Sequence, residues 1–155
     1  MDIDQQIHAL IEGAPPEANI KQAISVVSPV IRTVAQQLKH SEYYILQSVS
    51  NQWLQVAVAR KDNPTQPKRV VYAYPSLAAA AGDPLAKGNP GLMALPMPVA
   101  RLLFQLPSIE PVDSLIFWET EGRDQAIEVR RTDLKTMFQS HLTQDMKPPV
   151  PPNIA

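Results

Sequence analysis

The sequence predicts an α+β domain with an antiparallel sheet of about five strands and helices packed on one face of that sheet. Three observations lead to this prediction. Apolar residues recur at helical spacing before residue 40, and they recur at a spacing of two from residue 42 to residue 74 and again from residue 114. Short polar turns separate most of the expected strands, which is typical of hairpins and not of parallel crossovers.

Two helical segments are expected at the N-terminus. The first covers residues 2–12 and ends at Gly13. The second covers residues 17–40, and Ser28-Pro29 interrupts it, so the pattern predicts either one kinked helix or two helices with Ser28 as the second N-cap. Its apolar stripe either packs into the core or forms the seam of a homodimer. The stripe consists of Ile20, Ile24, Val27, Ile31, Val34 and Leu38.

A three-stranded meander is predicted after residue 41, because β-branched and aromatic residues alternate with polar ones. A tight turn at Ser50-Asn51 joins its first two strands, and a short helix capped by Ser76 follows the third. The expected strands are residues 42–49, 52–60 and 69–74.

Residues 82–98 are dense in glycine and proline, so no regular structure is expected there. The segment nevertheless carries large apolar side chains. Those side chains either cover the domain's own core or form an exposed patch that binds a partner protein. The candidate partner-binding residues in it are Leu85, Leu92, Met93, Leu95 and Met97.

The last part of the domain is predicted to be a helix, a second β-hairpin and a final helix. The expected bounds are 97–106 for the first helix, 114–119 and 125–130 for the strands, and 133–142 for the last helix. Residues 1–142 therefore form one domain. Residues 143–155 are proline-rich and are expected to be a disordered tail, with Pro149 and Pro152 as a second candidate site for a partner.

Composition narrows the classes of function. The net charge of −1 argues against a nucleic-acid-binding protein, and the absence of cysteine removes thiol chemistry and suits a cytoplasmic location. No segment is apolar for long enough to span a membrane. Basic residues occur in short pairs, which are either strand ends meeting solvent or, where two pairs meet, a weak anion site. These pairs are Arg60-Lys61, Lys68-Arg69 and Arg130-Arg131.

No motif for phosphate binding, nucleophilic catalysis or metal binding occurs in the chain, so no catalytic residue, cofactor or metal is expected. Acidic residues between Glu110 and Asp124 are the weak basis for an enzyme of unrecognised type. Aromatic residues on the predicted strands either pack in the core or line a ligand pocket between the sheet and the helices. The candidate pocket residues are Tyr72, Tyr74 and Trp118.

The stretches YYILQSVSNQWLQVAVAR, KRVVYAYPSLAAAA and DSLIFWETEGRDQAIEVRRTDLKTMFQSHL give a resemblance over about residues 43–142. The chain resembles small conserved cyanobacterial proteins of unassigned function. The resemblance is one of general sequence character without a specific motif, and it implies no functional residue.

These observations favour a non-enzymatic interaction, assembly or regulatory module that acts as an adaptor for another protein. The alternative hypothesis is a sensor domain that binds a small ligand in a pocket between sheet and helices.

Overall fold

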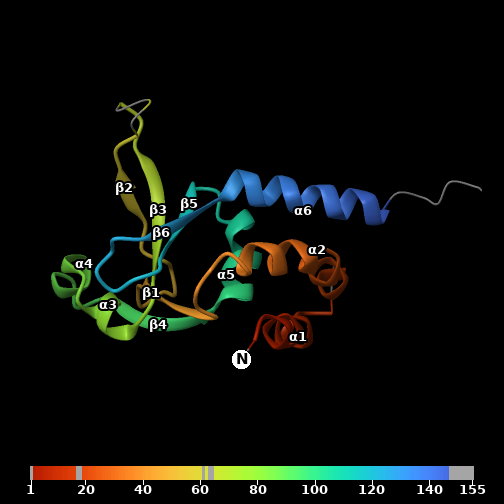
Figure 1. Cartoon of the computed structure of the whole chain (residues 1–155), viewed down its shortest axis with the longest axis horizontal. Helices are drawn as coiled ribbons and strands as arrows, with labels where there is room; N and C mark the ends of the chain where they lie inside the picture. The colour runs from red at the N-terminus through yellow and green to blue at the C-terminus, as the bar shows by residue number, and fades with distance from the viewer. Residues whose placement is uncertain (1, 17–18, 61, 63–64, 147–155) are drawn as a thin grey trace, which may run out of the picture.

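The computed structural model describes residues 2–16, 19–60, 62 and 65–146. It shows an α+β domain in which a six-stranded sheet stands between a layer of long helices and a pair of short ones (Figure 1). In chain order the elements are α1 (Ile3–Gly13), α2 (Ile20–Ala35), β1 (Glu42–Gln47), β2 (Val56–Val58), β3 (Lys68–Tyr74), α3 (Leu77–Ala81), α4 (Pro84–Lys87), β4 (Met93–Pro98), α5 (Val99–Gln105), the 3-10 turn η2 (Leu106–Ser108), β5 (Ser114–Trp118), β6 (Ala126–Arg130) and α6 (Arg131–Met146).

The sheet is mixed, and its strand order is β4-β1-β3-β5-β6, with β2 also paired to β3. Strand β3 is central: β5 lies along one edge, and the other edge is shared by β1 near Tyr74 and by β2 near Val70. All pairs are antiparallel except β3 with β5, which are parallel because the chain crosses over between them through residues 75–113. The prediction of an antiparallel class holds for most of the sheet, which has six strands where about five were predicted, but the prediction of a simple meander is wrong.

The predicted turn at Ser50-Asn51 is present. The Asn51 N–H donates to the Ser48 carbonyl at 3.0 Å, and Asn51 has a φ of 63°, in the left-handed region that asparagine tolerates. The paired segment after the turn is short, with an isolated bridge between Gln47 and Trp53, and β2 then leaves β1 to join β3.

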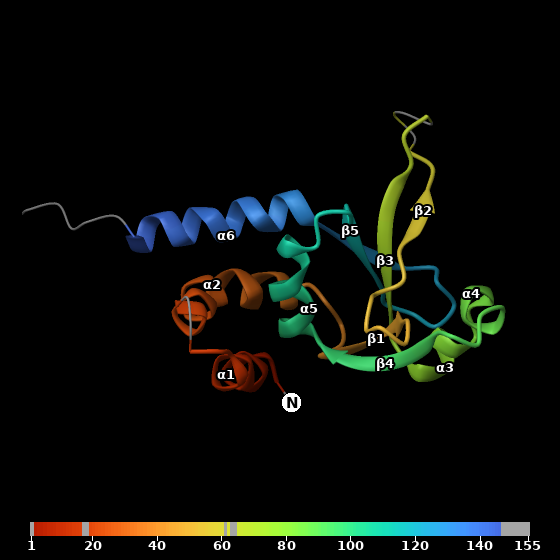
Figure 2. The same cartoon turned by 180° about the vertical axis from the view of Figure 1, so that it is seen from behind.

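Four helices, α1, α2, α5 and α6, cover one face of the sheet, as Figures 1 and 2 show from opposite sides. The main core lies between this layer and the sheet, where the Tyr43 and Phe117 rings meet edge to face at 4.9 Å. The predicted stripe of α2 packs into this core, and its central members Ile24, Val27 and Ile31 are at most 1% exposed. A homodimer seam along the stripe would first require these side chains to leave the core.

Helix α2 runs through Pro29 as one helix, so the alternative of two helices is wrong. A proline at this position cannot donate to the carbonyl four residues earlier, that of Ser25. The Ser28 hydroxyl donates to this same carbonyl at 2.8 Å and replaces the missing donor. The sequence therefore supplies its own compensation for the proline.

The short helices α3 and α4 lie on the opposite face of the sheet. Ala80 of α3 packs with Leu46 and Tyr74, whose side chains point away from the main core. The prediction that helices cover only one face is therefore not confirmed. They cover only part of this second face, and the rest of it is where the candidate site lies.

Helix α6 begins at Arg131 and extends to Met146, four residues beyond its predicted end. Pro149 and Pro152 lie outside the described residues. Among the described residues, no helix combines the length and the apolar character that crossing a membrane requires.

Candidate functional site

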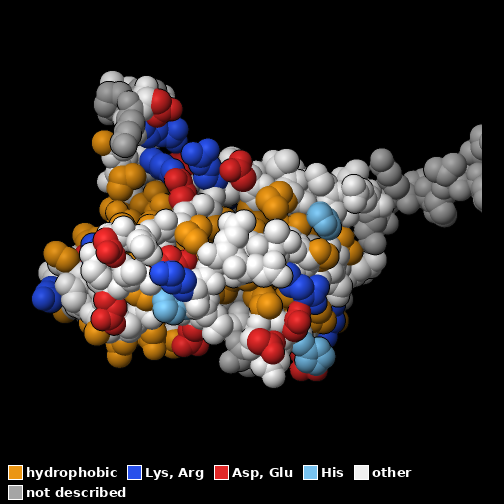
Figure 3. Space-filling view, in the orientation of Figure 1, with side chains coloured by type: hydrophobic (Ala, Val, Ile, Leu, Met, Phe, Trp, Pro, Cys, Tyr) orange, Lys and Arg blue, Asp and Glu red, His pale blue; other side chains and the backbone are white. Residues whose placement is uncertain are grey.

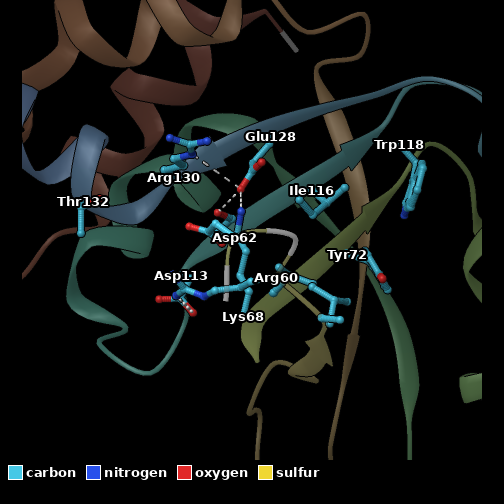
Figure 4. Close-up of a pocket in the computed structure, with 14 residues that line it drawn as sticks. Arg60, Asp62, Lys68, Tyr72, Asp113, Ile116, Trp118, Glu128, Arg130 and Thr132 are labelled. Carbon is cyan, nitrogen blue, oxygen red and sulfur yellow. Dashed lines mark hydrogen bonds and ion pairs between the residues drawn. The ribbon is translucent and has the colours of Figure 1, made fainter. Parts of the chain in front are cut away.

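The uncovered part of the second face carries a pocket of about 770 Å³. We call it the open-face pocket (Figure 4). The alternation of side chains along a strand places every second residue of β3, β5 and β6 on this face. The cross-strand register Val70–Ser114–Arg130 and the next row, Tyr72–Ile116–Glu128, form its floor. The lining residues are Val58, Ala59, Arg60, Asp62, Lys68, Val70, Tyr72, Asp113, Ser114, Ile116, Trp118, Glu128, Arg130 and Thr132.

The pocket has an aromatic end. The Tyr72 and Trp118 rings lie 5.6 Å apart, and the Arg123 guanidinium lies over the Trp118 ring at 5.9 Å. The indole Nε1 of Trp118 is buried and has no hydrogen-bond partner among the described residues. An unsatisfied buried donor costs free energy, and in the present arrangement of the side chains this nitrogen is covered and not open to the pocket.

The opposite end of the pocket is charged (Figure 4). Lys68 forms an ion pair with the Oε2 atom of Glu128, which also accepts a hydrogen bond of 2.6 Å from the Ser114 hydroxyl. The Arg130 Nε lies 3.9 Å from the same oxygen, a distance too long for a hydrogen bond. Burial lowers the pKa of Lys68, and the nearby positive charges of Arg130 and Arg60 lower it further.

Arg60 completes the charged end. Its Nη2 lies 3.6 Å from the Oδ2 of Asp113, and that oxygen already accepts a hydrogen bond of 2.9 Å from the Arg69 backbone N–H. The Nε of Arg60 is buried and, within the part of the chain that the structure describes, has no partner. Both buried side-chain polar atoms without a partner in the described chain, Arg60 Nε and Trp118 Nε1, therefore belong to residues that line this one pocket.

The structure brings together two of the three aromatic residues predicted for a pocket. Tyr72 and Trp118 line the open-face pocket, whereas Tyr74 is 1% exposed and its hydroxyl donates to Asp83. The pocket does not lie between the sheet and the layer of α1, α2, α5 and α6, because core side chains such as Phe117 fill that space. The pocket lies on the other face of the sheet.

The structure separates the predicted apolar residues of segment 82–98. This segment is not irregular: it contains α4 and the edge strand β4, so the prediction of no regular structure is wrong. Its large apolar residues differ in exposure: Leu85, Met93 and Leu95 are 40%, 48% and 36% exposed, Leu92 is half-buried, and Met97 is 4% exposed and part of the main core.

Strand β4 forms an outer edge of the sheet, yet it offers little backbone for a further strand. Proline cannot donate a hydrogen bond, so Pro96 and Pro98 occupy positions that point outward from β1. Of the outward positions in the strand, only Ala94 has an N–H to offer. A partner at this edge would bind the side chains of Met93 and Leu95 and not extend the sheet.

The acidic residues between Glu110 and Asp124 do not converge on a common point. Glu119 is buried and accepts the Tyr43 hydroxyl at 2.8 Å, Glu121 accepts the Ser76 hydroxyl at 2.7 Å, and Asp113 faces the open-face pocket. No cluster of three histidine, aspartate or glutamate side chains suited to a metal ion occurs among the described residues.

Comparison with known proteins adds no assignment: neither a family model nor a curated protein matches this chain. The class that the fold and the site define is an α+β domain with a surface pocket that is apolar and aromatic at one end and charged at the other.

The sequence pointed to single residues of the charged end but not to their combination. Lys68 and Arg130 belong to the basic pairs considered for a weak anion site, and Asp113 belongs to the acidic residues between Glu110 and Asp124, whereas Glu128 gave no signal of its own. The alternation of side chains along a strand is a signal that could have grouped these residues. It puts Lys68 on the same face as Tyr72, and Ser114 on the same face as Trp118.

Proposed function

We propose that this protein is a non-enzymatic interaction module and that its open-face pocket binds a segment of a partner protein. The observation that supports this most strongly is the coincidence in one pocket of an apolar floor, the Tyr72 and Trp118 rings at one end and the exposed Arg130 guanidinium at the other. An extended peptide can lay apolar side chains on this floor and place a polar side chain against the Arg130 guanidinium at the same time.

The composition of the pocket also suits an interface between proteins. Tryptophan, tyrosine and arginine are the residue types that contribute most often to binding energy at interfaces, and all three line it. Figure 3 shows hydrophobic side chains on the sheet below the β2–β3 hairpin, with basic and acidic side chains gathered above them. An apolar centre with a polar rim is the usual anatomy of a binding patch.

Site-directed photo-crosslinking in the native host tests this proposal. We would place p-benzoylphenylalanine at Tyr72, and, as a matched control, at Phe104, an aromatic residue half-buried on the helical side of the molecule. The expected result is one crosslinked protein from the Tyr72 position, joined through one defined segment. A synthetic peptide of that segment should then bind the purified protein.

Two outcomes would contradict the proposal: no protein crosslinked through the Tyr72 position, or the same set of proteins crosslinked through Phe104. The substitution Ile116→Asp, which puts a charge on the apolar floor, should abolish binding of the identified peptide. Circular dichroism and a urea titration would establish that this variant is folded.

A second candidate function is a sensor for a small ligand. The volume of about 770 Å³ lies in the range of small-molecule pockets, and this observation favours the alternative. Native mass spectrometry of the protein purified from its host separates the two functions. A bound small molecule whose removal lowers the Tm would support the sensor, whereas an unliganded protein that crosslinks a peptide segment would support the module.

The exposed β4 side chains constitute a separate surface for the same kind of function. We propose that Met93 and Leu95 add a second contact with a protein partner, because both are more than a third exposed on an edge strand. The double substitution Met93→Ser/Leu95→Ser should weaken capture of the crosslinked partner while leaving the affinity of the isolated peptide for the open-face pocket unchanged. Equal capture by the variant and the wild type would remove the β4 surface from the proposal.

A further inference from the structure

We infer that the open-face pocket recognises a short extended segment with an acidic side chain at one end and an aromatic or large apolar side chain four residues away. This inference rests on the proposed function, and it specifies the chemistry of the partner. Three features of the pocket support it: spare cationic donors at one end, aromatic rings at the other, and a distance between them that is set by the strands.

The charged end has donors to spare although its formal charges balance. Three cations, Arg60, Lys68 and Arg130, line the pocket together with three carboxylates. Two of those carboxylates are engaged internally: Glu128 by Lys68 and Ser114, and Asp113 by the Arg69 N–H and Arg60. The third, Asp62, is exposed.

The spare donors belong to the two arginines. The Arg60 Nη2 lies 3.6 Å from Asp113 and the Arg130 Nε lies 3.9 Å from Glu128, so neither contact is an ordinary hydrogen bond, and the two side chains are 36% and 64% exposed. A guanidinium binds a carboxylate through paired, charge-assisted N–H groups, and such hydrogen bonds are roughly twice as strong as those between neutral groups. Because the pocket is neutral overall, recognition depends on these placed donors and not on a general attraction for anions.

The spacing of the segment follows from β5 and β6. Arg130 of β6 at the charged end lies in register with Ser114 of β5, and Trp118 at the aromatic end lies four residues further along β5, which corresponds to about 13 Å along the strands. In an extended peptide, residues i and i+4 are separated by the same distance and project on the same side. Residue i+2 also projects on that side, and it would lie over Val70 and Ile116, where only an apolar side chain avoids an unpaired polar group.

The aromatic end supplies the second anchor. Tyr72 and Trp118 present their rings to the pocket, and the cation of Arg123 lies over the Trp118 ring. An aromatic side chain at i+4 can pack against these rings. The predicted pattern is therefore acidic–x–apolar–x–aromatic, in either chain direction.

Fluorescence anisotropy with labelled peptides tests the pattern on the full-length protein. The probes are the capped peptide Gly-Asp-Ala-Leu-Ala-Phe-Gly, its reversed sequence, and the counterparts of both with Asn or Lys in place of Asp. At least one Asp peptide should bind about tenfold or more tightly than its Asn counterpart, and the Lys peptides should bind more weakly still. This preference should shrink as salt is added.

Protein variants connect the preference to the pocket. Arg60→Gln and Arg130→Gln should each reduce the difference between the Asp and Asn peptides, and the double variant should abolish it. The matched control is Arg101→Gln, which removes one positive charge from an exposed position on α5, away from this face. The control should retain the full preference for Asp.

The inference is overturned if no probe binds, if Asp and Asn peptides bind equally, or if Arg101→Gln reduces the preference as much as the pocket variants do. The photo-crosslinking experiment distinguishes its failure from that of the proposed function. A partner segment crosslinked at Tyr72 that lacks any acidic residue would leave the interaction module standing and reject the acidic pattern. The absence of any crosslinked segment would reject both.

Discussion

Asp83 holds the α3–α4 pair to the rest of the domain, and its removal gives the sharpest test of how the second face of the sheet is organised. The carboxylate is 2% exposed and accepts hydrogen bonds from the Tyr74 hydroxyl, the Arg123 guanidinium and the Leu85 backbone N–H. These donors belong to β3, to the β5–β6 turn and to α4, so one side chain joins three parts of the chain. The substitution Asp83→Ala should therefore lower the free energy of unfolding.

The size of the effect follows from what the substitution leaves behind. Removing one partner of a buried ion pair costs about 3–5 kcal/mol, because the other charge stays buried without compensation. The Arg123 side chain is 35% exposed and can turn partly toward water, so the lower end, about 3 kcal/mol, is expected for Asp83→Ala. A matched control is Glu110→Ala, which removes an exposed carboxylate in the turn before β5 and should change stability by less than about 0.5 kcal/mol.

The pH dependence gives this prediction a second readout. Burial by itself would raise the pKa of Asp83, but the hydrogen bonds from Tyr74 and Leu85 and the charge of Arg123 outweigh it and hold the pKa below the ordinary value of 3.8. A carboxyl group whose pKa is lowered on folding contributes stability above its unfolded pKa and loses that stability as the pH falls through the folded pKa. The difference between wild type and Asp83→Ala should thus be full near neutral pH and shrink below pH 3.8.

Urea titrations of wild type, Asp83→Ala and Glu110→Ala, at neutral pH and at several acidic values, would measure these differences. A loss of less than about 1 kcal/mol at neutral pH would show that the carboxylate does not hold α3 and α4 in place. A loss that stays constant as the pH falls would show instead that the substitution acts through packing and not through the charge.

Two further predictions concern other buried polar contacts. Tyr43→Phe removes the hydroxyl that donates to the buried Glu119 and should lower the free energy of unfolding, measured by urea titration, by about 1–2 kcal/mol. An unchanged free energy of unfolding would show that other donors suffice for this carboxylate. Ser28→Ala removes the donor to the Ser25 carbonyl and should lower the free energy of unfolding by about 1 kcal/mol. In a Pro29→Ala background the loss should be much smaller, because the restored backbone N–H of residue 29 can donate to the same carbonyl. A double-mutant cycle with equal losses in both backgrounds would refute this compensation.

Local patterns in the sequence predicted most of the helices and strands, because each depends on a repeat that neighbouring residues carry. Strand β4 was missed because the two prolines in MALPMP weaken the pattern of a strand. In the structure these prolines lie at outward positions of an edge strand, where no N–H is needed. The rule against proline in strands therefore failed for a physical reason that depends on where the strand lies in the sheet.

The parallel pairing of β3 with β5 could not be read from local patterns. Hairpin turns indicate antiparallel neighbours, but the chain between β3 and β5 runs through three helices and another strand before it returns. Which strand lies beside β3 is decided by the packing of the whole helical layer. The placement of α3 and α4 on the second face depends likewise on Asp83, whose partners Tyr74 and Arg123 lie 9 and 40 residues away.

The candidate site shows the same division between local and long-range information. Aromatic residues on strands were identified as pocket candidates, and alternation along β3 and β5 correctly puts Tyr72 and Trp118 on accessible positions. The charged end exists only because β3 and β5 are parallel, since that register aligns Val70 with Ser114 and thereby brings Lys68 of one strand near Glu128 and Arg130 of another. An antiparallel pairing would reverse β5 relative to β3 and separate these charges. A pairing that the sequence did not reveal therefore builds the proposed anion-binding end.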